Sequence, residues 1–339
     1  MIVCSAYHGR TFNTQRIMNN FTDPAILFFL LGIFSGLVKS NLEIPAQVSR
    51  FLSLYLLMAL GLKGGFALHE SGFNTQVLGG LGIAVVLAVL VPLISYPILK
   101  RCISAFDAAA IAATYGSVSA VTFITAVQFL EKSDIAYGGH MAAAMALMES
   151  PAIILAVLFA NMARKQNKGV NASPAPGKGF GHLLQESFTE GAQLLLLGAM
   201  LIGYMSGDAG KEAMQPFTGD LFKGMLAFFL LDMGLTTAKH LPKLKSVSRW
   251  MIAYAVIAPI AHATLAWVLA KATGASIGDT ALLMVLAASA SYIAVPAVVR
   301  YAIPEANPSL YVGLSLGITF PLNILVGIPV YVQLAGVTL

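Results

Sequence analysis

Ser289-Ala290-Ser291-Tyr292-Ile293-Ala294-Val295-Pro296 interrupts an apolar run that begins near Asp279. Serines that lie close together compete for backbone hydrogen bonds, while the proline removes one N–H donor and disfavours helical geometry at the residue before it. A helix that reaches this stretch is therefore expected to stop and start again. The sequence predicts two half-helices that meet inside one apolar segment.

A second stretch of the same design lies in the first half of the chain. Asp107 and an apolar run lead into Gly116-Ser117-Val118-Ser119-Ala120-Val121-Thr122. Asp107 precedes Asp279 by 172 residues, and Ser117 precedes Ser289 by the same 172 residues. Two interrupted apolar segments at corresponding places are typical of the binding site of a secondary transporter.

The composition is that of an integral membrane protein surrounded by a lipid bilayer. Of its 339 residues, 58% are hydrophobic and 10% are charged, whereas about 25% of the residues of a soluble domain are charged. The net charge of +5 favours contact with anionic lipid headgroups over nucleic acid, because no basic surface interleaved with aromatic residues accompanies it. Cys4 and Cys102 have the spacing of neither a disulfide framework nor a metal site.

The hydropathy of the chain predicts an all-α polytopic protein with ten membrane spans, since each apolar stretch has about the 20 residues that cross a bilayer. The first and the sixth stretches are short, and tilt accommodates such a length. The predicted spans are 24–40, 47–66, 77–99, 107–130, 139–163, 189–206, 217–238, 249–272, 279–303 and 309–332.

A second pair of motifs indicates an internal repeat. Gly61, in Met58-Ala59-Leu60-Gly61-Leu62-Lys63, precedes Gly234, in Leu231-Asp232-Met233-Gly234-Leu235-Thr236, by 173 residues. Because a repeat of five spans is odd, the second copy must enter the membrane upside down, which gives a 5+5 inverted repeat. The predicted organisation is a polar N-terminal tail (1–23), a first repeat (24–163), a basic Gly/Pro-rich cytoplasmic linker (164–188) and a second, inverted repeat (189–339).

The distribution of basic residues predicts the orientation. If the N-terminus is outside, the inner segments hold 13 of the 20 Lys and Arg residues and the outer segments hold 7. The 13 are Lys39, Arg50, Lys100, Arg101, Arg164, Lys165, Lys168, Lys178, Lys239, Lys243, Lys245, Arg249 and Arg300. Cytoplasmic segments carry the excess of Lys and Arg. Both termini are therefore expected to be extracytoplasmic, in a multi-pass protein of the inner (plasma) membrane.

The motifs point to transport and not to an enzyme. The sequence has no nucleophile elbow, Walker loop or His/Cys metal cluster, so neither catalysis nor a cofactor is expected, and a gradient must drive transport. At each helix break, free N–H groups attract an anion and free carbonyl groups attract a cation. The serine hydroxyls can complete both sites without a fixed charge. Close helix packing through small residues is the alternative explanation of the serine clusters.

Several other polar residues lie in predicted spans. Asp232 and Glu149 are intramembrane acids, which are costly and usually functional, although each can instead form a salt bridge or an interfacial cap. Asn323 can offer a neutral oxygen to sodium. Asp107 and Asp279 begin their helices, where a carboxylate caps free N–H groups and has a structural role.

The chain resembles the sodium-dependent bicarbonate permease family over about residues 24 to 335. The resemblance implies a sodium symporter for bicarbonate that has core and gate domains, forms a homotrimer and is controlled by a PII-like protein that responds to adenine nucleotides. The motifs that carry it are Leu60-Gly61-Leu62-Lys63-Gly64-Gly65, Gly116-Ser117-Val118-Ser119, Glu149-Ser150-Pro151-Ala152, Ser289-Ala290-Ser291-Tyr292-Ile293-Ala294-Val295-Pro296-Ala297 and Pro304-Glu305-Ala306-Asn307-Pro308.

We therefore expect the anion between the two helix breaks and sodium, the coupling ion, beside it. The predicted bicarbonate site is Gly116, Ser117, Val118, Ser119, Ala290, Ser291 and Tyr292, and the predicted sodium site is Ser119, Thr122, Ser289, Asn323, Asp232 and Glu149. The basic linker residues that can dock the regulator are Lys165, Lys168 and Lys178, although a plain tether would have the same composition.

Two other classes of transporter and one receptor class remain as alternatives. One is a sodium-coupled carrier of another small anion. Another is a sodium/proton antiporter that uses Asp232 and Glu149, which would need an acid that titrates near neutral pH. A membrane receptor that does not transport is the third, and it would have little use for an inverted repeat.

Overall fold

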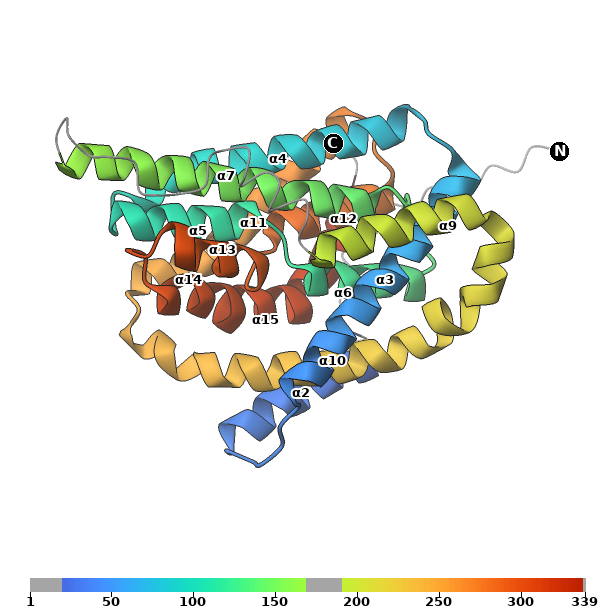
Figure 1. Ribbon diagram of the computed structural model, residues 1–339, viewed down its shortest axis with the longest axis horizontal. Coiled ribbons are helices and arrows are strands. Elements are labelled where there is room, and N and C mark those ends of the chain that lie inside the picture. The colour runs from blue at the N-terminus through green and yellow to red at the C-terminus, as the bar shows by residue number, and fades with distance from the viewer. Residues whose placement is uncertain (1–19, 169–190, 338–339) are drawn as a thin grey trace.

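The computed structural model describes residues 20–168 and 191–337, and within these ranges every regular element is a helix. Figure 1 shows the helices packed into one body in which segments from both halves of the chain lie side by side. The helices are α2 (Pro24–Leu37), α3 (Ala46–Ser71), α4 (Thr75–Leu99), α5 (Ala105–Gly116), α6 (Ala120–Lys132), α7 (Met141–Lys168), α9 (Gly191–Gln215), α10 (Leu221–His240), α11 (Arg249–Ala272), α12 (Ile277–Ala288), α13 (Ala294–Ala302), α14 (Pro308–Leu314), α15 (Phe320–Leu322) and α16 (Ile328–Ala335).

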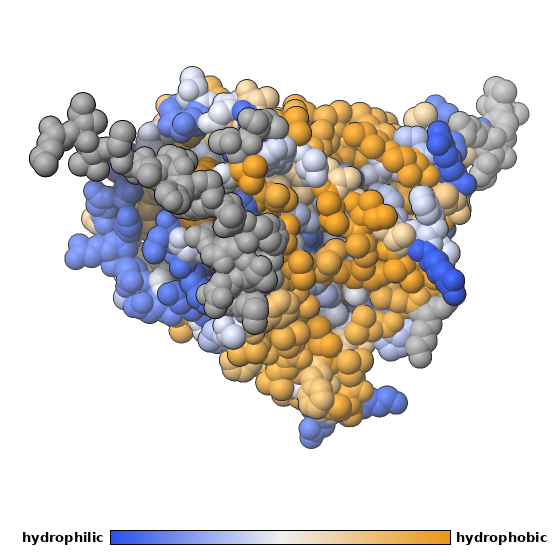
Figure 2. All heavy atoms as spheres, turned by 180° about the vertical axis from the view of Figure 1, so that it is seen from behind, coloured by the Kyte–Doolittle hydropathy of each residue, from blue (hydrophilic) through white to orange (hydrophobic). Residues whose placement is uncertain are grey.

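Seven helical stretches of the described chain are long and apolar enough to cross a membrane, which supports a multi-pass membrane protein. Figure 2 shows hydrophobic residues as a broad band across one face, with hydrophilic residues gathered toward the ends of the molecule. Large apolar side chains such as Leu201 and Met205 of α9 are exposed. Such an exposed apolar band is expected where lipid replaces water. The seven stretches are Ala46–Ser71, Thr75–Leu99, Ala105–Lys132, Met141–Lys165, Gly191–His240, Arg249–Ala272 and Pro308–Ala335.

Both predicted helix breaks are present. The helix α5 ends at Gly116 and α6 begins at Ala120, while α12 ends at Ala288 and α13 begins at Ala294. Each broken segment therefore supplies two helix ends in the interior of the molecule. These ends belong to segments that lie close in space although they are far apart in the sequence.

The starts of α5 and α12 differ from the expectation in one respect. Ser104 and Ser276 are the N-caps, and their hydroxyl oxygens accept from the N–H groups of Asp107 and Asp279. The carboxylates of these two aspartates instead accept N–H groups of distant loops, 2.7 Å from Asn307 N to Asp107 and 2.6 Å from Gly138 N to Asp279. A serine at the N-cap satisfies the local donors, so each carboxylate is available to a loop from the other half of the chain.

The stretch Gly191–His240 is too long for one straight crossing. Its 50 residues would extend about 75 Å as an ideal helix, against a hydrocarbon thickness of about 30 Å. The helical geometry is interrupted at Gly207, with φ of 55°, and again by a π-helical turn at Pro216–Asp220. Figure 1 shows α9 leading into a bend from which α10 returns beside α3. Glycine adopts the positive φ without the steric cost that other residues have.

Two helix pairs pack through small residues. The helix α2 lies along α10, and α3 lies along α9. A Cβ atom on Gly32 would come 3.0 Å from the Cα of Gly234, and one on Gly65 would come 2.9 Å from the Cα of Gly203. Backbones can approach this closely only where side chains are absent. We call α2, α3, α9 and α10 the paired-helix unit.

The remaining helices, α4 to α7 and α11 to α16, form what we call the broken-helix unit. Within it α4 packs on α5 and α7, and both α11 and α16 pack on α12. The stretch Pro308–Ala335 is one bent helical segment in which π-helical turns at Ser315–Thr319 and Asn323–Gly327 separate α14, α15 and α16. Turns of π-helix frequently occur at functional sites.

Candidate functional site

The two helix breaks bind each other directly. The N–H of Ser119 donates to Oγ of Ser289 over 3.0 Å. The N–H of Ser291 donates to the carbonyl oxygen of Thr114, the third residue from the end of α5, over 2.8 Å. Each broken segment therefore accepts a hydrogen bond from a backbone N–H of the other. The two breaks that the 172-residue spacing matched are in contact in the interior.

The serine hydroxyls hold the first turns of the half-helices that follow. Oγ of Ser119 accepts from the N–H of Thr122 at 3.2 Å and from its hydroxyl at 2.9 Å. Oγ of Ser291 accepts from the N–H of Val295 at 3.2 Å. Ser119 and Ser291 are 3% and 2% exposed. Because these hydroxyls cap the first turns of α6 and α13, they fix the direction of the positive helix ends.

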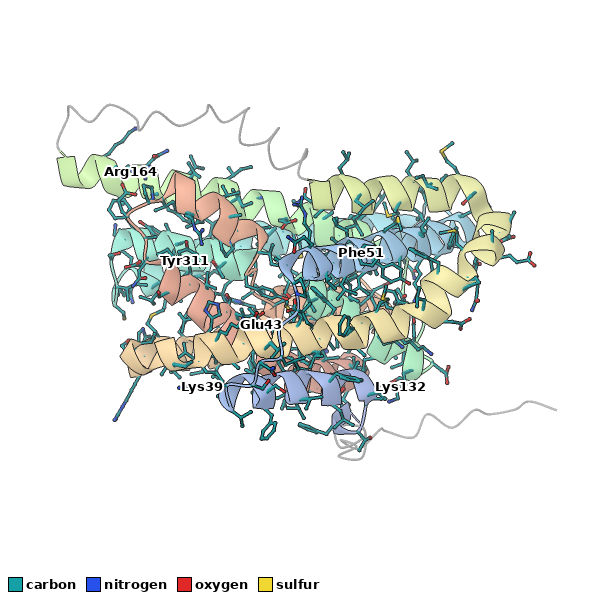
Figure 3. All side chains as sticks on the ribbon, turned by 60° about the horizontal axis from the view of Figure 1, so that its bottom comes forward. Lys39, Glu43, Phe51, Lys132, Arg164 and Tyr311 are labelled. Atoms are coloured by element: carbon teal, nitrogen blue, oxygen red, sulfur yellow. The ribbon has the colours of Figure 1, made fainter. Side chains whose placement is uncertain are left out.

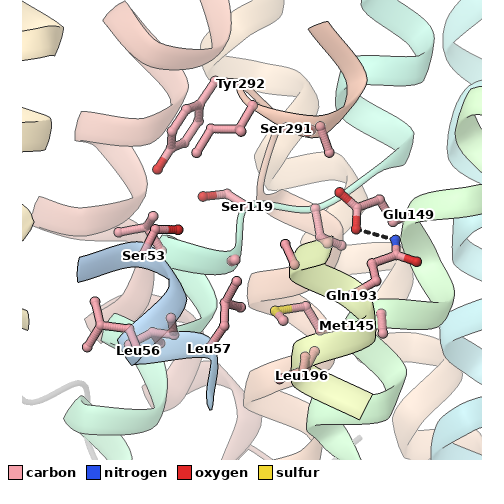
Figure 4. Close-up of a pocket in the computed structure, with 18 of the residues that line it drawn as sticks. Ser53, Leu56, Leu57, Ser119, Met145, Glu149, Gln193, Leu196, Ser291 and Tyr292 are labelled. Carbon is pink, nitrogen blue, oxygen red and sulfur yellow. Dashed lines mark hydrogen bonds between the residues drawn. The ribbon is translucent and has the colours of Figure 1, made fainter. Parts of the chain in front are cut away.

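A pocket of about 710 Å³, counted with its solvent-open part, lies beside these helix ends and is called the central pocket. Figure 4 shows Ser119 and Tyr292 on one side of it and Glu149 with Gln193 on the other. Its walls come from α3, α6, α7, α9, α10, the start of α13 and both helix breaks. The sequence-predicted residues that line it are Val118, Ser119, Glu149, Ser291 and Tyr292.

The acid in the central pocket has an amide partner that sequence reasoning missed. Nε2 of Gln193 donates a short hydrogen bond to the carboxylate of Glu149. Gln193 is 4% exposed and lies in the first turn of α9, so the bond joins the paired-helix unit to the broken-helix unit. A buried amide in an apolar span is a sequence signal for a polar partner, and it could have singled out Gln193. Ser53 of α3 also lines the pocket and had no such signal.

Two buried neutral oxygens without partners lie at or next to the helix breaks. Nδ2 of Asn323 donates to the carbonyl oxygen of Ala288 at 2.8 Å, while Oδ1 of Asn323 is buried without a hydrogen-bond partner. Oγ of Ser117 is likewise buried and unpartnered. Buried oxygens without partners are rare and costly. Carbonyl and amide oxygens at an unwound helix end are the groups that coordinate sodium in broken-helix transporters.

The other predicted site residues surround the central pocket without lining it. Gly116, Thr122, Ser289 and Ala290 are buried in the packing around the breaks, and Ser289 also donates to the carbonyl oxygen of Leu286 at 2.8 Å. Among the residues the structure describes, no group of three or more His, Cys, Asp or Glu side chains gathers to hold a metal ion. Cation binding in this part of the chain would depend on neutral oxygens and single acids.

Asp232 lies apart from the lining of the central pocket. Its carboxylate accepts a short hydrogen bond from the hydroxyl of Ser49, so it joins α10 to α3 within the paired-helix unit. Its neighbour Met233 accepts from the hydroxyl of Tyr292 at 3.6 Å. Asp232 is therefore next in the chain to a residue that contacts the second break, but its own carboxylate binds Ser49 of α3.

Of the linker lysines, Lys165 is exposed near the end of α7 and Lys168 is the last residue of that helix. Lys178 lies outside the described residues, as does the N-terminal tail up to residue 19. On the same end of the molecule, Arg164 forms an ion pair of 2.7 Å with Glu305, a residue of the Pro304-Glu305-Ala306-Asn307-Pro308 motif.

Comparison with known proteins gives one match that covers nearly the whole chain. The family model of the Na⁺-dependent bicarbonate transporter superfamily matches residues 24–336. No curated protein matches the chain. The matched region contains both helix breaks and every wall of the central pocket.

Proposed function

The chain belongs to the Na⁺-dependent bicarbonate transporter superfamily, and from that premise we propose that it imports bicarbonate by sodium symport through alternating access. Family membership implies that bicarbonate and sodium are the transported ions and that the protein is not an enzyme. The observation that carries the proposal is the contact between the two helix breaks beside the central pocket. Two half-helix N-termini that face one pocket favour an anion.

Bicarbonate would bind at the first turns of α6 and α13. Ser119 and Ser291 line the central pocket there, with Val118 and Tyr292 beside them. Gly116, Ser117 and Ala290 would shape the backbone around the anion. Positive helix ends attract an anion without a lysine or arginine in the membrane, so the site avoids the cost of burying a fixed positive charge.

Sodium would bind next to the anion, at the end of α12. The unpartnered Oδ1 of Asn323 supports this placement, together with the hydroxyls of Thr122 and Ser289. Glu149 lines the pocket and can contribute its charge. Asp232 is the less favoured ligand because Ser49 already binds its carboxylate.

The proposed architecture is ten crossings in a 5+5 inverted repeat. It follows if α9 and α10 cross separately and if α5 with α6, α12 with α13, and α14 to α16 each form one crossing. The reciprocal loop contacts support the symmetry. Asp107 binds the loop after α13, and Asp279, its counterpart in the second half, binds the loop after α6.

Uptake of labelled bicarbonate into proteoliposomes tests this function. An inward sodium gradient should drive uptake, and replacement of sodium by potassium should abolish it. If nitrate or another small oxyanion is carried as well as bicarbonate, the protein is a broader anion carrier. If sodium moves without bicarbonate and a pH-sensitive dye reports proton exit, the antiporter that uses Asp232 and Glu149 is correct.

We also propose that the protein is a homotrimer in the inner (plasma) membrane with both termini extracytoplasmic. A thiol reagent should then label Ser173→Cys in the linker only after permeabilisation, and labelling in intact cells at the same rate would reverse the orientation. A PII-like regulator is the proposed partner of the linker. Replacement of Lys165, Lys168 and Lys178 by Gln should weaken its copurification while sodium-driven uptake continues, because the attraction is electrostatic.

A further inference from the structure

The end of α6 carries two ion pairs that fasten it to the paired-helix unit. Nζ of Lys132, the last residue of α6, lies 2.8 Å from the carboxylate of Asp23, whose other oxygen caps α2 through the N–H of Ala25. The preceding residue, Glu131, binds Nζ of Lys63 in α3 with both oxygens, at 3.0 and 3.1 Å. Adjacent residues of one half-helix thus hold two helices of the other unit.

The pair between Lys63 and Glu131 is reinforced from two sides. Nζ of Lys63 lies 4.3 Å from the ring centroid of the fully buried Phe222, a distance at which the ring attracts the cation. The hydroxyl of Tyr137 donates to Glu131 at 3.1 Å. Burial raises the pKa of Tyr137, and the charge of Glu131 raises it further, so the phenol keeps the proton that it donates. The side chains of Lys63 and Glu131 are 18% and 31% exposed, which limits screening by solvent.

These ion pairs lie at the end of the molecule opposite the linker. Figure 3 shows Lys132 and Arg164, which precedes the linker, at opposite ends. The helix α6 starts at the central pocket and ends at Lys132. The central pocket therefore lies toward the linker side of the ion pairs along α6.

A second pocket, called the outer pocket, lies beside the ion pair of Asp23 and Lys132. These two residues line it together with Thr125, Gln128 and others. It shares α6 and α10 with the central pocket, and on α10 the outer pocket reaches Leu226 while the central pocket reaches Phe229. Leu226 and Phe229 are 0% and 2% exposed, so packed apolar side chains separate the two pockets.

We propose that the outer pocket is the entry vestibule for the transported ions, and that the two ion pairs hold the end of α6 against α2 and α3 so that the apolar side chains between the two pockets stay packed. The proposal rests on the proposed function, since a vestibule has a use only in a transporter. Opening requires the end of α6 to move away from α2 and α3, because both pairs cross between the units. While the end of α6 is displaced, the central pocket would be closed on the linker side, as alternating access requires.

The chain offers a matched control. Lys211 of α9 and Glu70 of α3 form an ion pair of 2.5 Å in which both side chains are half-exposed. Both residues belong to the paired-helix unit, so a link between them does not cross between the units. A cross-link at Asp23 and Lys132 tests relative motion of the units. A cross-link at Glu70 and Lys211 shows how much of any effect comes from the thiol reagent itself.

The experiment uses cysteine pairs in a background without Cys4 and Cys102. In Asp23→Cys/Lys132→Cys, a short reducible bifunctional thiol reagent should lower sodium-driven uptake about tenfold or more, an effect of about 1.4 kcal/mol or more, and reductant should restore it. The same reagent on Glu70→Cys/Lys211→Cys should change uptake by less than about twofold. Full uptake by the cross-linked Asp23→Cys/Lys132→Cys protein would overturn the proposal.

A second measurement does not depend on the substrate. In inside-out vesicles, the rate at which a thiol reagent labels Ser53→Cys measures access to the central pocket from the linker side. Adding Glu131→Gln and Lys132→Gln should slow its labelling about twofold to fivefold, because the loss of the ion pairs favours the alternative conformation. Unchanged labelling would overturn the proposal even in a protein that transports another anion. If no variant takes up bicarbonate but labelling slows as expected, the proposed substrate is wrong and the closure stands.

Discussion

The two helix breaks occupy equivalent places in the two halves of the chain, yet they are held differently. The first covers residues 117–119 and the second covers residues 289–293. Ser119 is the N-cap of α6, and its hydroxyl accepts two hydrogen bonds from that helix, whereas Ile293 at the N-cap of α13 caps nothing and the hydroxyl of Ser291 accepts only one bond, from Val295. Val118 is 5% exposed and Ile293 is 55% exposed. The first break is thus a fixed support, while the second is longer and partly open to the central pocket.

This difference shows that equal spacing in the sequence does not produce equal structure. Both breaks contain serines 172 residues apart, but Ser289 bridges between the breaks while Oγ of its counterpart Ser117 is buried without a partner. The hydroxyl of Ser289 holds the two breaks together, whereas the hydroxyl of Ser117 makes no hydrogen bond within the described residues. Variants at matched positions therefore separate packing from binding.

The largest effect is expected from the pocket-lining pair, Ser119→Ala and Ser291→Ala. A hydrogen bond to a charged partner contributes about 1.5–3 kcal/mol, so each variant should raise the half-saturating concentration of bicarbonate, sodium or both about tenfold to hundredfold. Ser119→Ala should be the more severe, because its hydroxyl accepts two hydrogen bonds within α6. Uptake kinetics measure the change.

The control for this pair is the solubilised protein, which should keep its assembly and lose no more stability than the loss of a capping hydroxyl costs, about 0.5–2 kcal/mol. Wild-type half-saturation for both ions in both variants would mean that these serines serve helix packing alone. If Ser119→Ala and Ser291→Ala raise the half-saturating concentrations equally, the distinction between a fixed and an open break is wrong.

Ser289→Ala and Ser117→Ala form the second matched pair. Ser289→Ala leaves the N–H of Ser119 without its acceptor and should destabilise the protein by about 1–3 kcal/mol. Ser117→Ala removes a hydroxyl with no hydrogen-bond partner from the proposed anion site, so it should leave the melting temperature unchanged and raise the half-saturating bicarbonate concentration. Thermal unfolding in detergent and bicarbonate titration of uptake are the two measurements. An equal drop in melting temperature would contradict the difference between the two breaks.

Asn323→Leu tests the cation side, whose amide oxygen lies beside the second break. The residue 172 positions earlier is Pro151, so the first break has no equivalent amide. The variant should raise the half-saturating sodium concentration about fivefold, or about 1 kcal/mol, and should affect bicarbonate less. Gln333→Leu, on the same bent helical segment, serves as the control. Equal shifts for both ions would move the sodium site away from Asn323.

The smallest effect is expected from Pro296→Ala. Pro296 lies in the first turn of α13, beyond the break itself, where a helix does not need its N–H. The free energy of unfolding should change by less than about 1 kcal/mol and uptake should stay within about twofold. A large loss of uptake would show that the proline, and not the contact with the first break, keeps the second break open.

The sequence predicted the parts of the fold that depend on local chemistry. The serine cluster predicted where α12 ends, and the matched spacing predicted its partner. Pro296 was expected to disfavour helix at Val295, but both residues lie in the first turn of α13, where a helix accepts proline. No local pattern in the sequence indicates which distant residues contact each other. The hydrogen bond from Gln193 to Glu149 joins spans from opposite halves, and Ser49 binds Asp232 across 183 positions. Such partners are set by how helices pack, which a single sequence does not encode in its spacing.

The reciprocal loop contacts of Asp107 and Asp279 have a consequence for how the protein is made. They join residues 200 and 141 positions apart, and each links the two halves. Contacts of such separation form late, because the intervening chain must first be ordered. During synthesis the first half must therefore wait in the bilayer with the start of α5 incompletely bound. A nascent chain that stops before residue 307 would lack the backbone N–H that binds Asp107, so the start of α5 gains its full set of contacts only after the loop that follows α13 has been made.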